Sequence, residues 1–470
     1  MVAVVNVRTA GRLLGDQRRG RRLGQLVEAL AASCAAHLPT ALTGWCGVKA
    51  AYRFFANPAV TPEAILASAR PGLLERVAGQ TTVLLLQDTT TLDFTTHPAT
   101  RGVGPIGTRR QGHWGLLLHS CLAATPDGVP LGLAAQESWA RDPATTGQAR
   151  LRRTRAAEQK ESARWARVEA ASRAVLPAGV RTVTIADREA DLYTLFAAPR
   201  PATAQLLLRV AQTQRRVLAD ADALTPHALA DAVAAAPVVG RYSVALRAEP
   251  GRPARTALCT VRVGSVTLCP PQNQRAGVRQ TERVPLVALL AVEESPAAGQ
   301  PPLHWLLLTT LPVPDFAAAA ELLVWYSLRW LIERFHFVLK SGCRVEELQL
   351  QQGDRLRRAV AVCSLVALTV LGLTYLARDA PELPCTVALS TAEWQTLWRY
   401  RFPRQPLPTV PPPLGAVALQ VAQLGGFLGR AGDGDPGPLT LWRGLTRLHD
   451  LTAGALLAQP PPLLQDVGNA

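Results

Sequence analysis

Three carboxylates stand at positions where they could do chemistry together. Asp88 ends the apolar run 81–88, and Asp187 ends the apolar run 179–187. Such runs are typical of strands buried on both faces, and catalytic groups gather at strand ends in open α/β sheets. Glu333 follows in a later stretch with helical periodicity. The simpler interpretation of any one of them is a helix cap or a loop residue.

Three carboxylates that lie close together need a cation, because like charges a few ångströms apart repel strongly. Oxygen-only ligands favour Mg²⁺ or Mn²⁺. Two such ions activate an attacking oxygen and stabilise a leaving oxygen at phosphorus. If Asp88, Asp187 and Glu333 meet, we therefore expect a phosphodiester nuclease or strand transferase with two metal ions.

The stretch 325–340 contains Glu333, has no Gly or Pro, and is predicted to form one amphipathic helix. A helical wheel places four side chains on one face: Tyr326, Arg329, Glu333 and Lys340. A solvated face with an Arg–Glu pair is the simpler interpretation. The tyrosine, the neighbouring Trp330 and the rarity of lysine in this arginine-rich chain favour a face that contacts a ligand.

The composition bounds the class of protein. The chain has 470 residues and a net charge of +15. Its hydrophobic content of 48% excludes a disordered protein. The charge indicates a polyanionic partner, with nucleic acid favoured over a membrane surface; a compositional bias toward arginine is the alternative. Eight scattered cysteines without a CxxC pair and a polar N-terminus predict reduced thiols in a cytosolic protein without a signal peptide.

Residues 1–70 are predicted to form a basic helical module, with one helix opening at Gly15 and another over 47–56. Four of its arginines are candidate DNA contacts: Arg18, Arg19, Arg22 and Arg53. A solvated basic face remains the alternative for these residues.

A core of strands and helices follows, with an antiparallel hairpin over 116–133 and helices over about 150–175 and over 188–196. The segment from about 205 to 310 reads as a β-rich insertion of short apolar runs: 204–210, 241–246, 257–263, 265–268, 284–292 and 304–310. The uncharged stretch 359–377 is predicted to be a buried core helix, with a membrane span as the alternative. A proline-rich connector, 403–413, lies within a helical C-terminal module.

Taken in order, these motifs resemble those of the DDE transposases of bacterial insertion sequences, in the IS-four branch and closest to its Tn-five type. The resemblance is carried by four stretches, with weaker similarity toward both ends: 87–93, 186–191, 303–309, and Tyr326, Arg329, Glu333 and Lys340 at the spacing of the Y-R-E-K signature. It implies an α/β fold with a ribonuclease-H-like catalytic domain over 71–375, interrupted by the insertion at 205–310. Helical modules at 1–70 and 376–470 would bind DNA and form the dimer.

The resemblance also implies a reaction. Asp88, Asp187 and Glu333 would be the catalytic ligands of two Mg²⁺ or Mn²⁺ ions. A homodimer would bind the terminal inverted repeats of an element in bacterial cytoplasm, at the nucleoid. It would nick each end, form and reopen a hairpin, and join the 3′-OH to target DNA.

Roles in DNA binding follow in the same way. Tyr326, Arg329 and Lys340 would hold a phosphate beside a nucleotide flipped out of the duplex. Trp305 would stack on that base and Trp330 would fill the gap, although a strand-core tryptophan is the alternative for Trp305. Three further residues in matching stretches are possible DNA contacts or would support the metal ligands: Arg188, Glu189 and Arg209.

Two other functions remain open on sequence grounds. One is a catalytically silent DNA-binding protein derived from a transposase. The other is a ribonuclease-H-fold nuclease that does not transfer strands.

Overall fold

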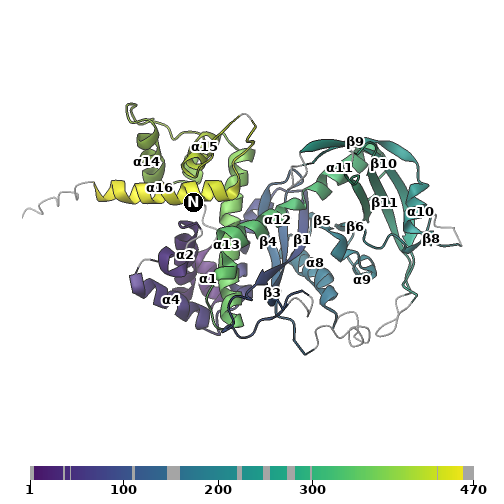
Figure 1. The fold of residues 1–470 in the computed structure, drawn as a ribbon, viewed down its shortest axis with the longest axis horizontal. Coiled ribbons are helices and arrows are strands. Elements are labelled where there is room, and N and C mark those ends of the chain that lie inside the picture. Colours follow the sequence, from purple (N-terminus) through teal and green to yellow (C-terminus); the bar gives the residue numbers. More distant parts are fainter. Residues whose placement is uncertain are drawn as a thin grey trace, which may run out of the picture. The chain divides into compact units, whose positions relative to one another are not determined.

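The structure is a computed structural model that describes the chain in ten segments: 5–34, 37–42, 44–107, 112–144, 159–219, 225–246, 254–272, 281–296, 299–430 and 432–458. It divides into two compact units, Arg70–Arg334 and the pair of segments Met1–Ala69 and Phe335–Ala470 (Figure 1). The expected modules 1–70 and 376–470 thus fall almost entirely in the same unit. Part of the helix expected over 150–175 lies outside the described residues.

The unit Arg70–Arg334 is a mixed α/β structure. Among the described residues its strands are β1 (Thr82–Asp93), β2 (Gly104–Pro105), β3 (Trp114–Ala124), β4 (Pro130–Trp139), β5 (Arg181–Ala186), β6 (Ala204–Arg209), β7 (Arg216–Leu218), β8 (His227–Ala228), β9 (Val238–Leu246), β10 (Arg255–Leu268), β11 (Val284–Glu293) and β12 (His304–Thr309). Its helices and 3₁₀ turns are α6 (Arg70–Val77), η2 (Glu161–Ala163), α8 (Arg164–Val175), η3 (Arg188–Ala190), α9 (Tyr193–Phe196), α10 (Leu229–Ala234), α11 (Phe316–Ser327) and α12 (Trp330–Phe337), the last of which runs on into the other unit.

One mixed sheet contains these strands (Figure 1). In its first half the order is β4–β3–β1–β5–β6; β1 is antiparallel to β3, and β5 is parallel to both β1 and β6. The hairpin expected over 116–133 is confirmed as β3 and β4. Its turn contains Gly128 at φ +89°, a left-handed conformation that favours glycine.

The helices α6 and α8 cover one face of this half-sheet. Alternate residues of β1 pack into the resulting core, where Val83 and Leu85 meet Leu73 of α6 and Val168 of α8. Because side chains alternate along a strand, Gln87 also points toward α8. Asp88, the next residue, points toward the opposite face of the sheet. The expected carboxylate site would therefore lie on the face away from α8.

The rest of the sheet is the β-rich region expected from the sequence. The run 204–210 forms β6, which lies directly beside β5 and so extends the first half of the sheet. The runs 257–263 and 265–268 were expected as separate strands, which is wrong. They form the single strand β10, because Gly264 stays extended and pairs with Ala288 of β11.

Two helix predictions are also wrong. The stretch 325–340 is interrupted between α11 and α12, where Arg329 N bonds to Tyr326 O and Ile332 N bonds to Arg329 O. These bonds to the third residue back tighten the chain and interrupt the α-helix between Ser327 and Trp330. The stretch 188–196 is split into η3 and α9 by Asp191, whose buried carboxylate accepts from backbone N–H groups of 211 and 212.

The other unit is helical. Its described elements are α1 (Val7–Leu13), α2 (Gln17–Ala31), α3 (Leu38–Ala41), α4 (Gly44–Ala56), α5 (Pro62–Ala67), a π-helical segment (Val338–Gly342), η5 (Val345–Glu347), α13 (Gly353–Asp379), η6 (Cys385–Val387), α14 (Thr391–Arg401), α15 (Leu414–Leu424) and α16 (Pro438–Leu457). As expected, α2 begins after Asp16, which caps it, and α4 ends before Asn57-Pro58.

The helix α13 organises this unit. It is long and apolar enough to cross a membrane, but 78% of its most apolar window is buried, as the prediction of a core helix requires. It contacts α2, α4 and α5 as well as α15 and α16 (Figure 1). Hydrogen bonds join distant parts of the chain: Arg358 donates to Phe55 O at 2.8 Å, and Trp442 Nε1 donates to Ala31 O at 2.7 Å.

An ion pair between α14 and α16 should make this unit sensitive to pH. His449 Nε2 is 2.8 Å from Glu393 Oε1. The hydrogen bond to Glu393 raises the pKa of His449 above its ordinary 6.5. Burial alone would raise the pKa of Glu393, but hydrogen bonds from His449 and Ser390 outweigh burial and lower it to about 2.

We therefore expect two losses of stability. The contribution of Glu393 is present above its ordinary pKa of 4.5 and is lost as the pH falls toward 2. The contribution of His449 is present below 6.5 and is lost as the pH rises through its raised pKa. Thermal unfolding of the wild type and His449→Gln from pH 5.5 to 9 checks this: the Tm advantage of the wild type should shrink as the pH rises. An advantage independent of pH would contradict it.

Candidate active site

The strands β1 and β5 bring two of the expected carboxylates together. The run that contains Asp88 was expected to end there, but β1 runs on to Asp93 because residues 88–93 pair with β3. These parallel strands pair with Leu86 opposite Ile185. Two residues further along, the same register places Asp88 opposite Asp187, on the face of the sheet away from α8. Asp187 also caps η3, since its Oδ1 accepts from Glu189 N at 3.0 Å. The register therefore gives Asp88 and Asp187 neighbouring positions, and the metal site itself stays a prediction.

Glu333 lies in the first turn of α12, where its carboxylate forms an ion pair with an arginine. Arg329 Nη2 is 2.6 Å from Glu333 Oε1. Among the residues that the structure describes, no three His, Cys, Asp or Glu side chains are placed to hold one metal ion. The structure therefore aligns Asp88 with Asp187 and holds Glu333 in an ion pair with Arg329.

Arg329 carries a positive charge close to Glu333 and Asp88. Burial would lower its pKa, but Tyr326, Glu333 and Asp88 together raise it. On the other side, partial burial raises the pKa of Glu189, and the charges of Asp187 and Asp88 raise it further. Carboxylate oxygens with surplus negative charge suit a hard divalent cation such as Mg²⁺, so the donor set fits the metal that the sequence implies.

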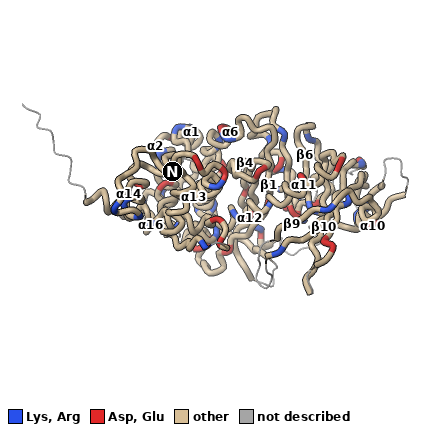
Figure 2. Tube along the Cα trace, turned by 90° about the horizontal axis from the view of Figure 1, so that it is seen from above, with Lys and Arg blue, Asp and Glu red and all other residues tan. Residues whose placement is uncertain are grey.

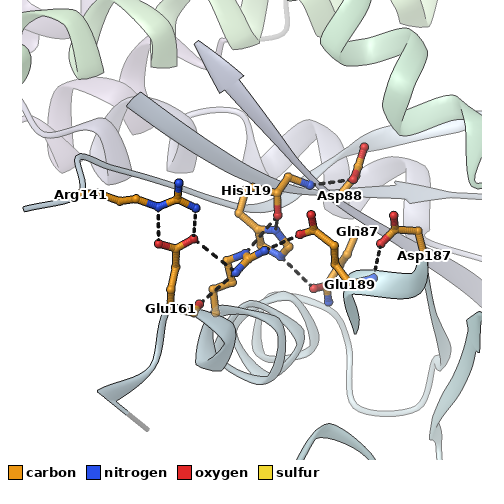
Figure 3. Close-up of polar contacts among 9 residues, drawn as sticks. Gln87, Asp88, His119, Arg141, Glu161, Asp187 and Glu189 are labelled. Atoms are coloured by element: carbon orange, nitrogen blue, oxygen red, sulfur yellow. Dashed lines mark hydrogen bonds and ion pairs between the residues drawn. The ribbon is translucent and has the colours of Figure 1, made fainter. Parts of the chain in front are cut away.

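A buried polar network lies behind the two aspartates (Figure 3). Thr89 Oγ1 is 2.8 Å from His119 Nδ1 and accepts from Arg164 Nε at 3.1 Å. Arg164 Nη2 also donates to Glu189 Oε2 at 2.7 Å. His119 Nε2 is 3.1 Å from Gln87 Oε1. The network therefore holds both neighbours of Asp88 in β1 and one residue of η3.

The hydrogen bonds of the network determine the tautomer of His119. Gln87 Oε1 can only accept, so His119 Nε2 carries the proton and donates it. His119 Nδ1 must then accept from the Thr89 hydroxyl, whose oxygen accepts from Arg164. In this tautomer every bond of the chain runs in one direction, from Arg164 through Thr89 and His119 to Gln87.

Sequence reasoning missed this network. His119 was visible as a polar residue inside the apolar run 116–124, but its partners could not be read from spacing. Arg164 begins α8 in a charged stretch, where nothing distinguishes a buried arginine from a solvated one. Arg141 and Glu161, which form a two-pronged ion pair at 2.7 Å beside Arg164, were missed for the same reason (Figure 3).

The aromatic residues expected near the site fall into two groups. Trp305 of β12 packs edge-on against Tyr326 of α11, with ring centroids 5.2 Å apart. The buried Tyr326 hydroxyl has no hydrogen-bond partner within the described ranges of the chain. Trp330 is 44% exposed at the start of α12. Trp305 and Tyr326 are thus in contact, while Trp330 is open to a partner.

Two further expected DNA contacts share a small hollow. Arg188 and Arg209 line a space of about 160 Å³ together with His304. Arg209 Nη2 donates to His304 O at 3.1 Å, which fixes its guanidinium at the rim. The hollow is positively charged and adjoins β12, the strand that carries Trp305.

Lys340 and the N-terminal arginines belong to the helical unit. Lys340 Nζ is 3.0 Å from Glu346 Oε1. Arg18 and Arg53 are exposed and Arg22 is half-buried. Arg19 Nη1 donates to Leu14 O at 2.7 Å, so it also closes the end of α1. Basic residues are spread over both units (Figure 2).

The helix α4 offers a further basic face that the sequence reasoning only partly identified. Arg53 shares its exposed side with Lys49, Tyr52 and Trp45, and Trp45 is 75% exposed. Aromatic and cationic side chains on one helix suit a nucleic acid.

Two family models match the ends of the chain and indicate its class of protein. Residues 7–60, which comprise α1 to α4, match the family model described as Transposase DNA-binding. Residues 365–460 match the model described as Transposase Tn5 dimerisation domain. Both matches support a Tn5-type transposase.

The two matches indicate a function for each end of the chain. Its N-terminal helices bind DNA, which accounts for the basic face of α4, and its C-terminal helices form a homodimer. The segment 61–364 lies between the matches and contains Asp88, Asp187 and Glu333. The assignment of these residues therefore depends on the geometry described above.

Proposed function

We propose that this transposase moves an insertion sequence by cutting its ends from DNA and joining them to a target. The observation that carries the proposal is the alignment of Asp88, within β1, with Asp187, just after the adjacent parallel strand β5, in a chain with transposase DNA-binding and dimerisation domains. The net charge of +15 supports binding to DNA. Such a protein would act in the cytoplasm, on the nucleoid.

The strand order supports a ribonuclease-H-like catalytic core within this proposal. In such a core the first strand lies at the centre, next to its antiparallel hairpin on one side and parallel strands on the other. The order β4–β3–β1–β5–β6 has this arrangement, with β1 at the centre. The strands from β7 to β12 would then be the insertion.

Asp88, Asp187 and Glu333 would hold two Mg²⁺ or Mn²⁺ ions. When bound, these ions would activate the attacking oxygen and stabilise the leaving oxygen at phosphorus. To bind the metal ions, Glu333 would have to break its ion pair with Arg329. The Arg329 guanidinium would then be free to bind another anion. Arginine holds phosphate through a planar fork, so Arg329 would then bind a DNA phosphate together with Tyr326 and Lys340.

The same residues serve each step of the proposed reaction. Nicking, hairpin formation, hairpin opening and strand transfer are all in-line displacements at phosphorus, so one site can perform them in turn. Hairpin formation requires a distorted DNA end. Base stacking of roughly 1–3 kcal/mol on an aromatic ring offsets part of that distortion, and Trp305 and Trp330 would provide it.

Trp305→Ala should therefore separate two steps. We expect the first nick to survive, while hairpin formation falls about 10-fold or more, as the loss of 1–3 kcal/mol of stacking predicts. Gel analysis of both products in one time course is the measurement. Equal loss of nick and hairpin would mean that Trp305 serves only to pack against Tyr326.

An assay on the element's own DNA tests the whole proposal. The DNA that flanks the gene should contain short inverted repeats, which supply the substrate. With Mg²⁺ and a target plasmid, we expect nicked, hairpin and joined products. Nicks without joined products would indicate a nuclease, and binding without nicks would indicate a catalytically silent DNA-binding protein.

A further inference from the structure

Arg164 is a buried cation in a position that needs an explanation. Its side chain is 8% exposed, at the first residue of α8. Burial lowers its pKa, and the nearby Glu189 and Glu161 oppose that shift. A buried charge is strongly unfavourable unless it is fully paired. The groups that pair with Arg164 must therefore stay within hydrogen-bond distance of it.

Those contacts join β1 to the turn that follows β5. Nε donates to Thr89, the residue after Asp88 in β1, and Nη2 donates to Glu189, in the 3₁₀ turn that Asp187 caps. Nη1 donates to Glu161 O at 3.1 Å, which anchors the group to η2. The guanidinium also lies over the rings of Trp139 and Trp165, at 5.7 and 5.3 Å from their centroids.

The fork of the guanidinium is suited to this task. Its nitrogens lie in one plane at fixed angles, so Thr89 and Glu189 are held at a fixed separation. Thr89 is held further through His119, which also binds Gln87. Both neighbours of Asp88 are therefore fixed on the α8 face, and Asp88 itself is directed toward the opposite face.

Building on the metal site proposed above, we propose that Arg164 is a positioning residue that sets the spacing of Asp88 and Asp187. It touches neither carboxylate. It acts through Thr89 on the middle of β1 and through Glu189 on the turn that follows β5. Groups that orient metal ligands in this way typically change metal affinity or activity by roughly 10–100-fold when they are lost.

Manganese binding to the full-length protein tests this without DNA. Mn²⁺ is titrated in and the free ion is followed by its electron paramagnetic resonance signal. We expect Arg164→Met to raise the dissociation constant by roughly 10-fold or more. Thr89→Val removes the hydroxyl between Arg164 and His119 with little change of shape, and should raise the constant in the same direction.

The matched control is Arg173→Met in the same helix. Arg173 Nε is 2.6 Å from the buried Glu169 Oε1, so this change also leaves a buried carboxylate without its cation. It should lower Tm and leave Mn²⁺ binding unchanged. An equal loss of Mn²⁺ affinity in Arg173→Met would overturn the proposal, because general destabilisation would then explain the effect.

The remaining outcomes are also decisive. Wild-type affinity in Thr89→Val, or in a folded Arg164→Met, would show that Arg164 only stabilises the core and would overturn its positioning role. If Arg164→Met does not fold, Thr89→Val decides alone. If the wild type binds Mn²⁺ no better than Asp88→Ala does, the proposed metal site itself fails, and the role of Arg164 fails with it.

Discussion

Glu333→Ala is expected to bind the element's ends like the wild type and to lose 3′ nicking in Mg²⁺. Metal ions contribute several kcal/mol of charge stabilisation to such a reaction, and each 1.36 kcal/mol is a factor of ten in rate. We therefore expect a loss of about 10³-fold or more. DNA binding should persist, because the DNA-binding match at 7–60 does not include this residue.

The control for this variant is Glu321→Ala in α11. Glu321 is an exposed carboxylate in the helix that precedes Glu333, so its loss changes the charge equally and leaves the site intact. Single-turnover nicking and a mobility-shift assay measure the two activities of each variant. Nicking at the wild-type rate by Glu333→Ala would falsify its assignment as a metal ligand.

Gly444→Ala should disrupt the dimerisation domain. Gly444 lies where α16 crosses α15, and a Cβ there would stand 1.8 Å from Val421 O. The obstacle is backbone, which cannot rotate away, so the two helices would have to separate. Overpacking of this kind typically destabilises by about 1–3 kcal/mol and occasionally more; with a backbone clash we expect about 3 kcal/mol or more.

Gly454→Ala in the same helix provides the comparison. Nothing lies within 4 Å of a Cβ at Gly454, so only helix propensity changes, which favours alanine by about 1 kcal/mol at most. Thermal unfolding and sedimentation at one protein concentration are the measurements. Gly444→Ala should lower Tm and weaken the dimer, while Gly454→Ala does neither. Unchanged Tm in Gly444→Ala would mean that α15 and α16 do not cross in this way.

The two buried strands could be predicted because their signal is local. Continuous apolar runs indicate β1 and β5, but they could not show that β1 runs on past Asp88 to Asp93, because that part of the strand depends on its pairing with β3. The buried helix α13 could be predicted from its composition in the same way. For the ends of the chain, the resemblance to transposases supplied the functions that the family matches bear out.

What the sequence could not show depends on contacts between distant residues. The break before Trp330 contains no Gly or Pro, so no residue type marks it; bonds to the third residue back produce it. Arg164 looks like any arginine at a helix start until Thr89 and Glu189 are placed beside it. The ion pair of Glu333 with Arg329 fits helical spacing, but spacing alone could not show that these two side chains meet.

The most direct test of the proposed active site is an anomalous difference map of the protein bound to Mn²⁺ and a DNA end that carries the inverted repeat. We predict manganese peaks coordinated by Asp88 and Asp187, with Glu333 released from Arg329 and bound to the same site. A map with Glu333 still on Arg329 and manganese bound by other residues would contradict a three-carboxylate metal centre.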